Sequence, residues 1–368
     1  MPPVKWVDVH PPASEPPANI RGPLAELALS MLWGSRNEGV REKFRSPLTP
    51  SAMEPLNYET EDGWSVVMQR CPPRPGSTGE PVLLASSANL SPSALDAYRD
   101  RSLVRALHEA GYDVYLFENR GSVNASPPQG IATFDFDDMV AHDVPAAIAA
   151  IQQKTGAKRV CWLGHGLGGQ LLVGHIASSG GYDIAAGITL NAPVHFDRLS
   201  STARRAAAVA RSLPDHWRLP LRRVQTMLTV ASRPADLARL TVRTEGPKAR
   251  GILLECTTDL ALGLAQQISR WHEVGRLVDR TNRFDYLDGL TGKKTPVLVI
   301  GSGGDAICSA SSTKPIADAL NNGRSEWWQL DDGWGHLDAI VGADAPTNVF
   351  PKLIQWLEKH RAECWTTE

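Results

Sequence analysis

The sequence has few cysteines, no long apolar run and no excess of charge of either sign. Its five cysteines are scattered along the chain: Cys71, Cys161, Cys256, Cys308 and Cys364. They form no CxxC pair and no Cys/His cluster, so neither a zinc site nor a disulfide framework is indicated, and we expect no metal and no organic cofactor. A formal net charge of -2 gives no reason to expect a nucleic acid or a membrane surface as a partner.

The start of the chain, MPPVKWVDVHPPASEPPANIRG, has neither the apolar run nor the cleavage pattern of a signal peptide. No stretch approaches the roughly 20 apolar residues that span a bilayer. We therefore expect a cytoplasmic protein without a membrane span. Its 368 residues suffice for one α/β domain with a sizeable insertion.

From Leu56 onward, short apolar strands alternate with amphipathic helices. LNYET and WSVVMQRC flank a turn at Asp62-Gly63, which predicts a hairpin. Later apolar runs such as PVLLASS, RVCWLG and AAGITLNAP are separated by helical patterns such as DMVAHDVPAAIAAIQQKTG. This alternation predicts a mostly parallel sheet with helices on both faces.

The alternation stops near His195 and resumes at TPVLVIGSGGD, and the segment between reads as mostly helical. Ligands bind at the carboxyl edge of open α/β sheets, where inserted helices often act as lids. We therefore predict an N-terminal arm (1–50), an α/β core in two parts (51–195 and 291–368) and a helical cap (196–290).

The stretch Val160 to Gly169, VCWLGHGLGG, predicts a strand that turns sharply into a helix. A G-x-S-x-G motif in this setting forms a nucleophile elbow, whose central residue is strained. Here the central residue is Gly166, which adopts the strained conformation easily but has no side chain with which to attack. A dinucleotide site fits poorly, because the glycine spacing is wrong and only Asp183 could serve as its acidic partner.

Two later residues follow strands in the order of a catalytic triad. Asp305 comes directly after the strand that ends in GSGG, and His336 lies in the loop DDGWGH after the strand EWWQL. In a Ser-Asp-His arrangement, His336 would be the general base and Asp305 would orient its ring. We predict that Gly166, Asp305 and His336 meet at one site.

Four stretches together resemble one family: YETEDGWSVVMQRCPP, RSLVRALHEAGYDVYLFENRGS, FDFDDMVAHDVPAAIAAIQQKTGAKRVCWLGHGLGG and GHLDAIVGADAPTNVFPKLIQWL. The sequence resembles the acid-lipase branch of the α/β-hydrolase superfamily, which contains lysosomal and gastric lipases. The resemblance covers most of residues 56–360, with the cap poorly matched. It is also similar to the hydrolase-like domains of some cholesterol-oxidase-type proteins and to polyester synthases, which carry cysteine at the elbow. The resemblance therefore implies an α/β-hydrolase fold with Ser or Cys expected at position 166.

The expected oxyanion loop departs from the family. Its His-Gly pair is replaced here by Ser86-Ser87. An oxyanion hole needs backbone N–H groups aimed at the developing charge, and we expect Leu167 to supply one and Ser87 or Ala88 the other. Ser86 and His165 are predicted to contact substrate.

Two cysteines could in principle replace the missing nucleophile. Cys161 lies within a strand and is expected to be buried and inert. Cys308 follows Asp305 in its loop and could approach the site. Core packing is the commoner role for a cysteine in either position.

Three explanations of Gly166 remain open. The chain can be an acyl-transfer enzyme whose nucleophile was changed to glycine. In that case we expect the chain as given to lack esterase activity above background, and Gly166→Ser or Gly166→Cys should fit the turn with modest strain. It can be a natural ligand-binding protein without hydrolytic activity. It can also be a non-covalent catalyst that uses His336 and Asp305 as a base pair. The first predicts hydrolysis or transfer of a small-molecule ester, lactone or thioester.

Arginines are frequent at the start of the predicted cap: Arg198, Arg204, Arg205, Arg211, Arg218, Arg222 and Arg223. One interpretation is attraction of an acidic group, such as a carboxylate or an acyl group linked to coenzyme A or to a carrier protein. The other interpretation, which we favour, is a solvated helix face.

Overall fold

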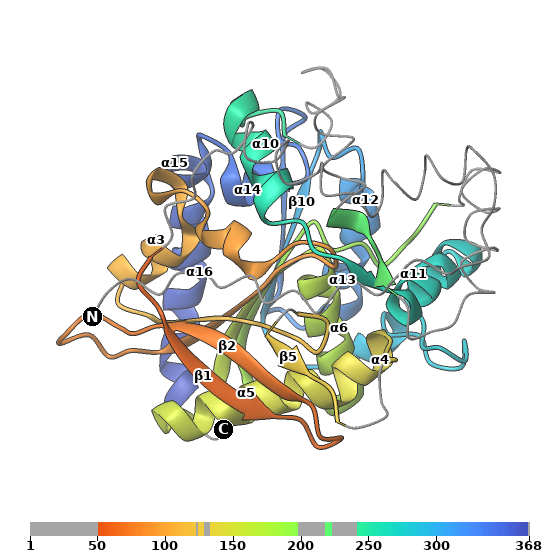
Figure 1. The fold of residues 1–368 in the computed structure, drawn as a ribbon, viewed down its shortest axis with the longest axis horizontal. Coiled ribbons are helices and arrows are strands. Elements are labelled where there is room, and N and C mark those ends of the chain that lie inside the picture. Colours follow the sequence, from red (N-terminus) through yellow and green to blue (C-terminus); the bar gives the residue numbers. More distant parts are fainter. Residues whose placement is uncertain (1–50, 123, 129–132, 198–217, 223–240, 367–368) are drawn as a thin grey trace, which may run out of the picture.

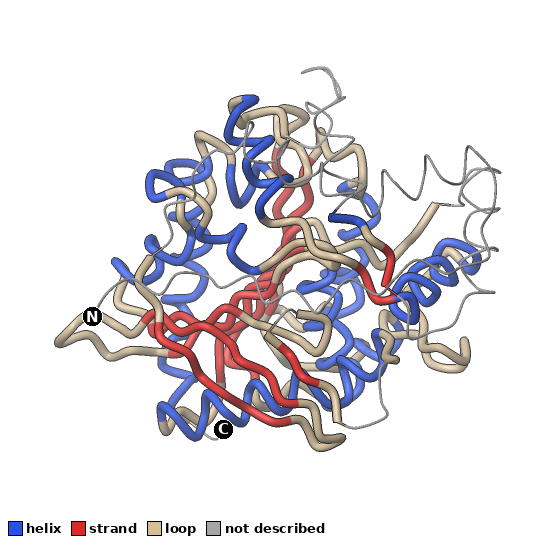
Figure 2. Tube along the Cα trace, viewed as in Figure 1, coloured by secondary structure: helices blue, strands red, loops and turns tan. Residues whose placement is uncertain are grey.

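The structure is a computed structural model that describes residues 51–122, 124–128, 133–197, 218–222 and 241–366. A nine-stranded sheet crosses the centre, with helices on both faces (Figures 1 and 2). The predicted mostly parallel α/β architecture is confirmed. The predicted arm (1–50) and much of the predicted cap (198–217 and 223–240) lie outside the described residues.

The predicted hairpin opens the sheet. Strands β1 (Glu54–Glu59) and β2 (Ser65–Cys71) pair antiparallel, with Leu56 opposite Met68. The turn between them passes through Gly63, whose φ of 89° lies in the left-handed region that glycine adopts without strain. The short strand β5 (Ala125–Ser126) also pairs with β2.

The remaining strands form the parallel part of the sheet. They are β3 (Pro81–Ala85), β4 (Asp113–Leu116), β6 (Val160–His165), β7 (Ile184–Leu190), β10 (Val297–Ser302) and β11 (Glu326–Leu330). The order across the sheet is β1-β2-β4-β3-β6-β7-β10-β11. Every residue of β3, β4, β6, β7 and β10 is buried, as expected for parallel strands covered on both faces. Strands β6, β7, β10 and β11 therefore end side by side at one edge.

Helices cover the two faces of the sheet. The longer ones in the core are α3 (Leu103–Glu109), α5 (Val144–Thr155), α6 (Leu167–Ser179) and α16 (Phe350–His360). Shorter ones are α4 (Phe136–Asp138), α12 (Ala310–Thr313), α13 (Pro315–Leu320), α14 (Asp338–Val341) and α15 (Ala345–Asn348). One apolar cluster includes α3 and α16, and a second includes α5, α6 and α13.

Helix ends follow local sequence signals. Helix α5 ends at Thr155 and is followed by Gly156 in the left-handed conformation that glycine favours at this position. The segment from Ala310 to Leu320 forms two short helices, α12 and α13, because Pro315 cannot donate a backbone hydrogen bond. A short π-helix, η3 (Met139–Asp143), precedes α5.

The described helices and strands of the predicted cap include α10 (Gly246–Glu255), α11 (Leu262–Val274), the short 3-10 helix η4 (Asp288–Leu290) and the two-stranded sheet of β8 (Arg218–Leu219) and β9 (Leu260–Ala261). Ser91 N–H donates to Cys256 O at 2.7 Å, and Thr258 N–H donates to Asn89 O at 2.9 Å. These bonds hold the end of α10 against the loop that follows β3. The boundaries of the cap stay a prediction.

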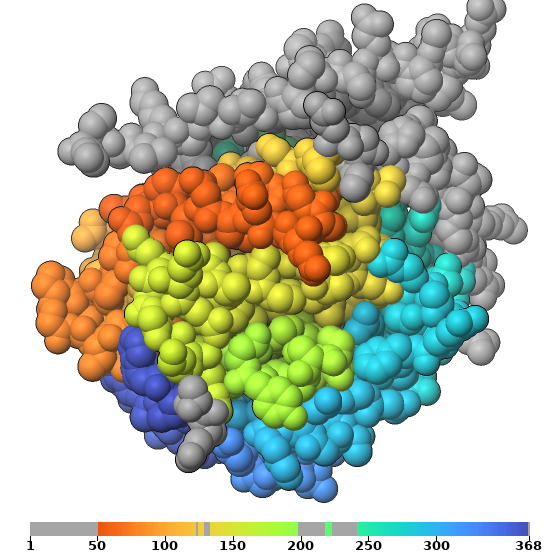
Figure 3. Space-filling model, turned by 90° about the horizontal axis from the view of Figure 1, so that it is seen from below, coloured from red at the N-terminus to blue at the C-terminus, as the bar shows by residue number. Residues whose placement is uncertain are grey.

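Different elements lie at the top and at the bottom of the molecule as it is drawn in Figure 1. Helices α10 and α14 lie near the top of Figure 1, and α12 lies lower and to the right. The view from below shows the β1–β2 hairpin and α5 at the surface (Figure 3). Within the described part of the chain, no helix is long and apolar enough to cross a membrane.

Candidate active site

The chain turns from β6 into α6 at Gly166. Gly166 has φ 54° and ψ −117°, a conformation that side chains rarely tolerate, and its N–H donates to Leu190 O at 2.9 Å. The turn is tight, because a Cβ on Gly164 would lie 2.2 Å from the Gly168 backbone. The predicted strand–turn–helix elbow is therefore present, with no side chain at its apex.

Asp305 and His336 meet as the sequence predicts. His336 Nδ1 lies 2.7 Å from Asp305 Oδ2, and both residues are buried. The other carboxylate oxygen accepts hydrogen bonds from the N–H groups of Ile307 (2.7 Å) and Cys308 (2.9 Å). These bonds fix the carboxylate, which orients the imidazole and leaves Nε2 as the basic nitrogen.

A residue that the sequence analysis missed positions this pair. Asn191, at the end of β7, is fully buried and donates through Nδ2 to His336 O at 2.9 Å and to Ser302 Oγ at 3.1 Å. Its Oδ1 accepts from Ser302 N–H at 2.8 Å. A polar residue directly after the apolar strand AAGITL was the signal that could have found it.

Asp338 is a second missed residue, and it joins the His336 loop to the predicted cap. Its fully buried carboxylate accepts from the N–H groups of Gly335, Val242 and Arg243 at 2.8, 2.6 and 3.1 Å. The Thr244 hydroxyl donates to the other oxygen at 2.9 Å. One carboxylate thus fixes the cap segment beside the base.

His165 does not face a substrate, contrary to our expectation. It has no exposed surface, and its ring lies 4.6 Å from the ring of His336. Its Nε2 donates to His336 O at 3.0 Å. Burial, and next the neighbouring His336, lower the pKa of His165 to about 3, so the ring is neutral. His165 therefore acts on the position of His336.

The predicted oxyanion donors lie at the same edge. Leu167 is the first residue of α6, so its N–H has no acceptor within the helix, and the positive end of the helix dipole is there. Gly168 N–H donates to Ser86 O at 3.0 Å, which brings the loop after β3 against the elbow. Ser87 O accepts from Leu90 N–H at 3.2 Å, closing a turn that contains Ala88.

Ser86 is engaged within its own loop, and its predicted contact with substrate stays a prediction. Its hydroxyl donates to Leu90 O within the same loop. Its carbonyl oxygen is the acceptor for Gly168 N–H. Ser86 therefore stabilises the loop that carries Ser87 and Ala88.

Position 166 has less room than we expected from the sequence. A Cβ on Gly166 would lie 2.0 Å from Ser87 Oγ. Gly166→Ser or Gly166→Cys therefore fits only if the Ser87 side chain rotates away. The reason is a contact between two loops, which no local pattern in the sequence reveals.

Neither cysteine considered as a substitute nucleophile is activated. Cys308 is buried with Sγ 3.3 Å from Ser312 Oγ, and burial raises its pKa to about 12. Cys161 is fully buried with its Sγ 3.7 Å from that of Cys364, and its pKa is also raised. Cys161 is thus as inert as expected, and Cys308 does not present a reactive thiol.

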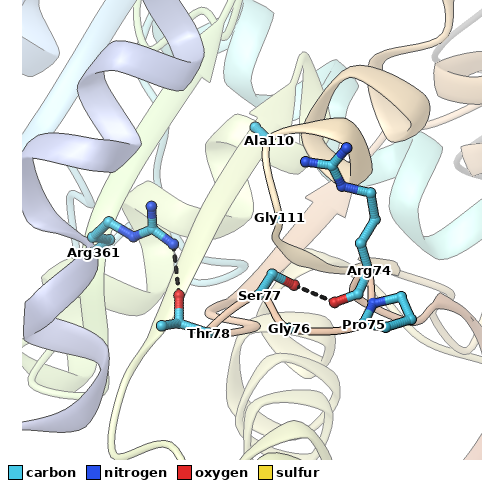
Figure 4. A pocket seen from close by; sticks show the side chains of 8 residues that line it. All are labelled: Arg74, Pro75, Gly76, Ser77, Thr78, Ala110, Gly111 and Arg361. Carbon is cyan, nitrogen blue, oxygen red and sulfur yellow. Dashed lines mark hydrogen bonds between the residues drawn. The ribbon is translucent and has the colours of Figure 1, made fainter.

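A cavity of about 640 Å³ lies at the other edge of the sheet (Figure 4). It is bounded by the turn Arg74–Thr78, by Ala110 and Gly111, and by Arg361, which donates to Thr78 Oγ1 at 2.7 Å. This turn precedes the amino end of β3, whereas the elbow follows the carboxyl end of β6, so the cavity is separate from the site. Among the described residues, no three His, Cys, Asp or Glu side chains are grouped to hold a metal ion.

The site geometry agrees with a comparison against known families. Residues 96–336 match the family model Hydrolase_4, described as "Serine aminopeptidase, S33". The chain belongs to this α/β-hydrolase family. The matched region includes the elbow and His336, and it ends at the base.

Curated relatives of this α/β-hydrolase include acid lipases. It is 35% identical to human gastric triacylglycerol lipase over 143 residues, which is 34% of each chain. It is 31% identical to human lipase member N over 151 residues, covering 38% of this chain and 37% of the relative. The matches thus span about a third of these lipases. The distant similarity to acid lipases is confirmed, and the similarity to cysteine-elbow relatives stays a prediction.

Solved structures share the fold of this α/β-hydrolase. A thermophilic esterase from Thermogutta terrifontis is 18% identical, with a TM-score of 0.57 over 84% of this chain and 99% of the esterase. A hydrolase from Pseudomonas aeruginosa is 17% identical, with a TM-score of 0.56 over 84% of this chain and 99% of that chain. These likenesses confirm the predicted α/β-hydrolase fold.

Proposed function

We propose that this chain catalyses acyl transfer from a carboxylic ester, with His336 as the general base and water as the acceptor. The observation that carries the proposal is the 2.7 Å contact between His336 Nδ1 and Asp305 Oδ2 beside the elbow. A carboxylate in this position holds the imidazole in one tautomer and stabilises the imidazolium that forms.

The surrounding groups have separate tasks in this reaction. His336 Nε2 removes a proton from the attacking oxygen and later returns it to the leaving alcohol. The N–H of Leu167, at the positive end of α6, faces the developing oxyanion and is joined by the N–H of Ser87 or Ala88. Asn191, His165 and Asp338 hold the backbone of the base loop in place.

The substrate class that we propose is an ester with an apolar acyl chain. The support comes from the relatives, whose names include triacylglycerol lipase and cholesteryl ester hydrolase. The described part of the cap also lies against the loops that carry Ser87 and His336. The arginine-rich segment predicted to attract an acidic acyl carrier lies almost wholly outside the described residues, with Arg218 and Arg222 as its described members.

A second candidate is a ligand-binding protein without turnover, and Gly166 is the observation that favours it. The elbow keeps its strained backbone but presents no nucleophilic side chain. Such a site could hold an ester at the oxyanion donors without cleaving it. The base pair His336–Asp305 would then only donate and accept hydrogen bonds.

The test is hydrolysis of p-nitrophenyl esters of graded acyl length by the full chain, by His336→Ala and by Asp305→Asn. We expect hydrolysis above buffer, falling by roughly a thousand-fold or more in His336→Ala, because the base is required to activate the attacking oxygen. Hydrolysis that survives in His336→Ala, or that never exceeds buffer, would refute the proposal. Saturable ester binding without hydrolysis, followed by tryptophan fluorescence, would support the second candidate.

A further inference from the structure

The space beside Gly166 is already filled by another side chain. A Cβ on Gly166 would lie 2.0 Å from Ser87 Oγ and 3.2 Å from Ser87 Cβ, whereas ordinary contacts between non-bonded carbons are about 3.5–4 Å. The side chain of an elbow nucleophile and the Ser87 hydroxyl would therefore compete for one volume. In this chain the hydroxyl has that volume to itself.

The backbone around Ser87 holds its Cα beside the elbow. Ser87 follows β3, which lies next to β6 in the sheet. Ser86 O accepts from Gly168 N–H, and Ser87 O accepts from Leu90 N–H. The Ser87 Cα is thereby held against the elbow, and only one torsion remains to orient Oγ. Ser87 is half-buried, so a substrate at this edge can reach it.

We infer that Ser87 supplies the nucleophile that the elbow lacks. The inference rests on the proposed function, since it needs His336 as the base. A hydroxyl from the loop after β3 would then do what the side chain at position 166 does in an ordinary elbow. Gly166 is consistent with this arrangement, because a residue with a side chain there would displace the Ser87 hydroxyl.

The reaction balances without any further reagent. Ser87 Oγ–H gives its proton to His336 Nε2 as Oγ bonds to the ester carbonyl carbon. The tetrahedral intermediate expels the alkoxide, which takes the proton from His336 and departs as the alcohol. The acyl group remains bound to Ser87 Oγ as an ester. Water then gives a proton to His336 and attacks that ester, and Ser87 Oγ recovers the proton as the carboxylic acid departs.

The other nucleophilic groups at this edge are engaged or buried. The Ser86 hydroxyl donates to Leu90 O. Cys308 is buried next to Ser312. Among the described hydrogen bonds, none involves the Ser87 hydroxyl, which is therefore available to the base.

The first experiment compares Ser87→Ala with Ser311→Ala, a matched control that removes an exposed serine hydroxyl from α12 at the same end of the molecule. We expect Ser87→Ala to lower kcat by roughly a thousand-fold or more with little change in KM, and Ser311→Ala to leave it unchanged. A fluorophosphonate probe should form a bond to Ser87 with loss of fluoride, as mapped by peptide mass spectrometry. Labelling should disappear in His336→Ala.

Two results would separate this inference from the proposed function. If Ser87→Ala hydrolyses esters like the wild type while His336→Ala does not, Ser87 is not the nucleophile and the proposed function stands. If no hydrolysis depends on His336, the proposed function fails. Labelling by the fluorophosphonate probe then tests by itself whether Ser87 is a nucleophile. His336-dependent labelling of Ser87 would support it, and no labelling or labelling elsewhere would overturn it.

A second experiment transfers the serine side chain from position 87 to position 166. The double variant Ser87→Gly/Gly166→Ser removes the side chain at one position and places it at the other. We expect the probe to label position 166 in the double variant, with faster hydrolysis than in Gly166→Ser alone, where the two side chains collide. Equal activity of the single and double variants would contradict the shared volume.

Discussion

The side-chain amide of Asn191 donates a hydrogen bond to the backbone carbonyl oxygen of His336 at 2.9 Å. Asn191 takes a left-handed backbone conformation, with φ 47°, directly after β7. Its amide also exchanges two hydrogen bonds with Ser302 at the end of β10. One buried side chain therefore holds the base loop to the ends of two neighbouring strands.

Asn191→Ala is expected to lower both stability and turnover. It removes the side-chain acceptor of the buried Ser302 N–H and one of the two donors to His336 O, which costs about 1–3 kcal/mol of unfolding free energy. We expect kcat to fall more than KM rises, because the base is misplaced. Urea unfolding and ester kinetics measure the two effects. Asn191→Gly is the control, since it keeps the backbone conformation. Wild-type behaviour of Asn191→Gly would show that the amide has no positioning role.

Asp338→Ala is expected to detach the segment around Val242 and Arg243 from the base loop. The N–H groups of both residues lose their acceptor, as do the Gly335 N–H and the Thr244 hydroxyl, so unfolding free energy should fall by about 1–3 kcal/mol. Hydrogen exchange of these two amides should accelerate. Asp344→Asn, which breaks a half-exposed ion pair with Arg243, should cost less than about 1 kcal/mol. Unchanged amide protection in Asp338→Ala would argue against this role.

His165 should make stability depend on pH in the acid range. Its pKa is lowered from 6.5 to about 3 in the folded chain, so below pH 6.5 the unfolded chain binds the extra proton. The stability from keeping His165 neutral is complete above pH 6.5 and is lost as pH falls from there towards 3. The slope of the unfolding free energy against pH approaches about 1.4 kcal/mol per pH unit in this range. Urea unfolding between pH 5 and pH 7 should give a smaller slope for His165→Gln, and equal slopes would exclude the effect.

Glu118 should change stability with pH in the opposite direction to His165. Burial raises its pKa from 4.5 to about 7, although side-chain hydrogen bonds from Ser122 and Asn124 oppose the shift. The folded chain therefore holds the proton more tightly than the unfolded chain, and this contribution to stability is lost as pH rises from 4.5 through 7. Glu118→Gln should lack this loss, as urea unfolding at pH 5 and pH 8 can measure. A variant that loses as much stability as the wild type between these pH values would contradict the assignment.

The sequence by itself determined the α/β architecture and the order in which the elbow, Asp305 and His336 follow their strands. Short apolar runs bounded by turn residues indicate strands, and period-3.6 apolar patterns indicate amphipathic helices, so the hairpin, the parallel strands and α5 could be predicted. The elbow glycines and the positions of Asp305 and His336 after their strands are also local features. Since the carboxyl ends of parallel strands share one edge, their meeting followed from topology.

Only the tertiary structure decided which side chain fills the site. Ser87 and Gly166 lie on separate loops, and their competition for one volume depends on how β3 packs beside β6. Asn191, Asp338 and His165 take their roles from contacts with the His336 loop, far away in sequence. A pattern of residue types records burial and chain direction, but it does not record which distant backbone atom a polar side chain will reach. That choice is made by close packing, where a change of a few tenths of an ångström separates contact from collision.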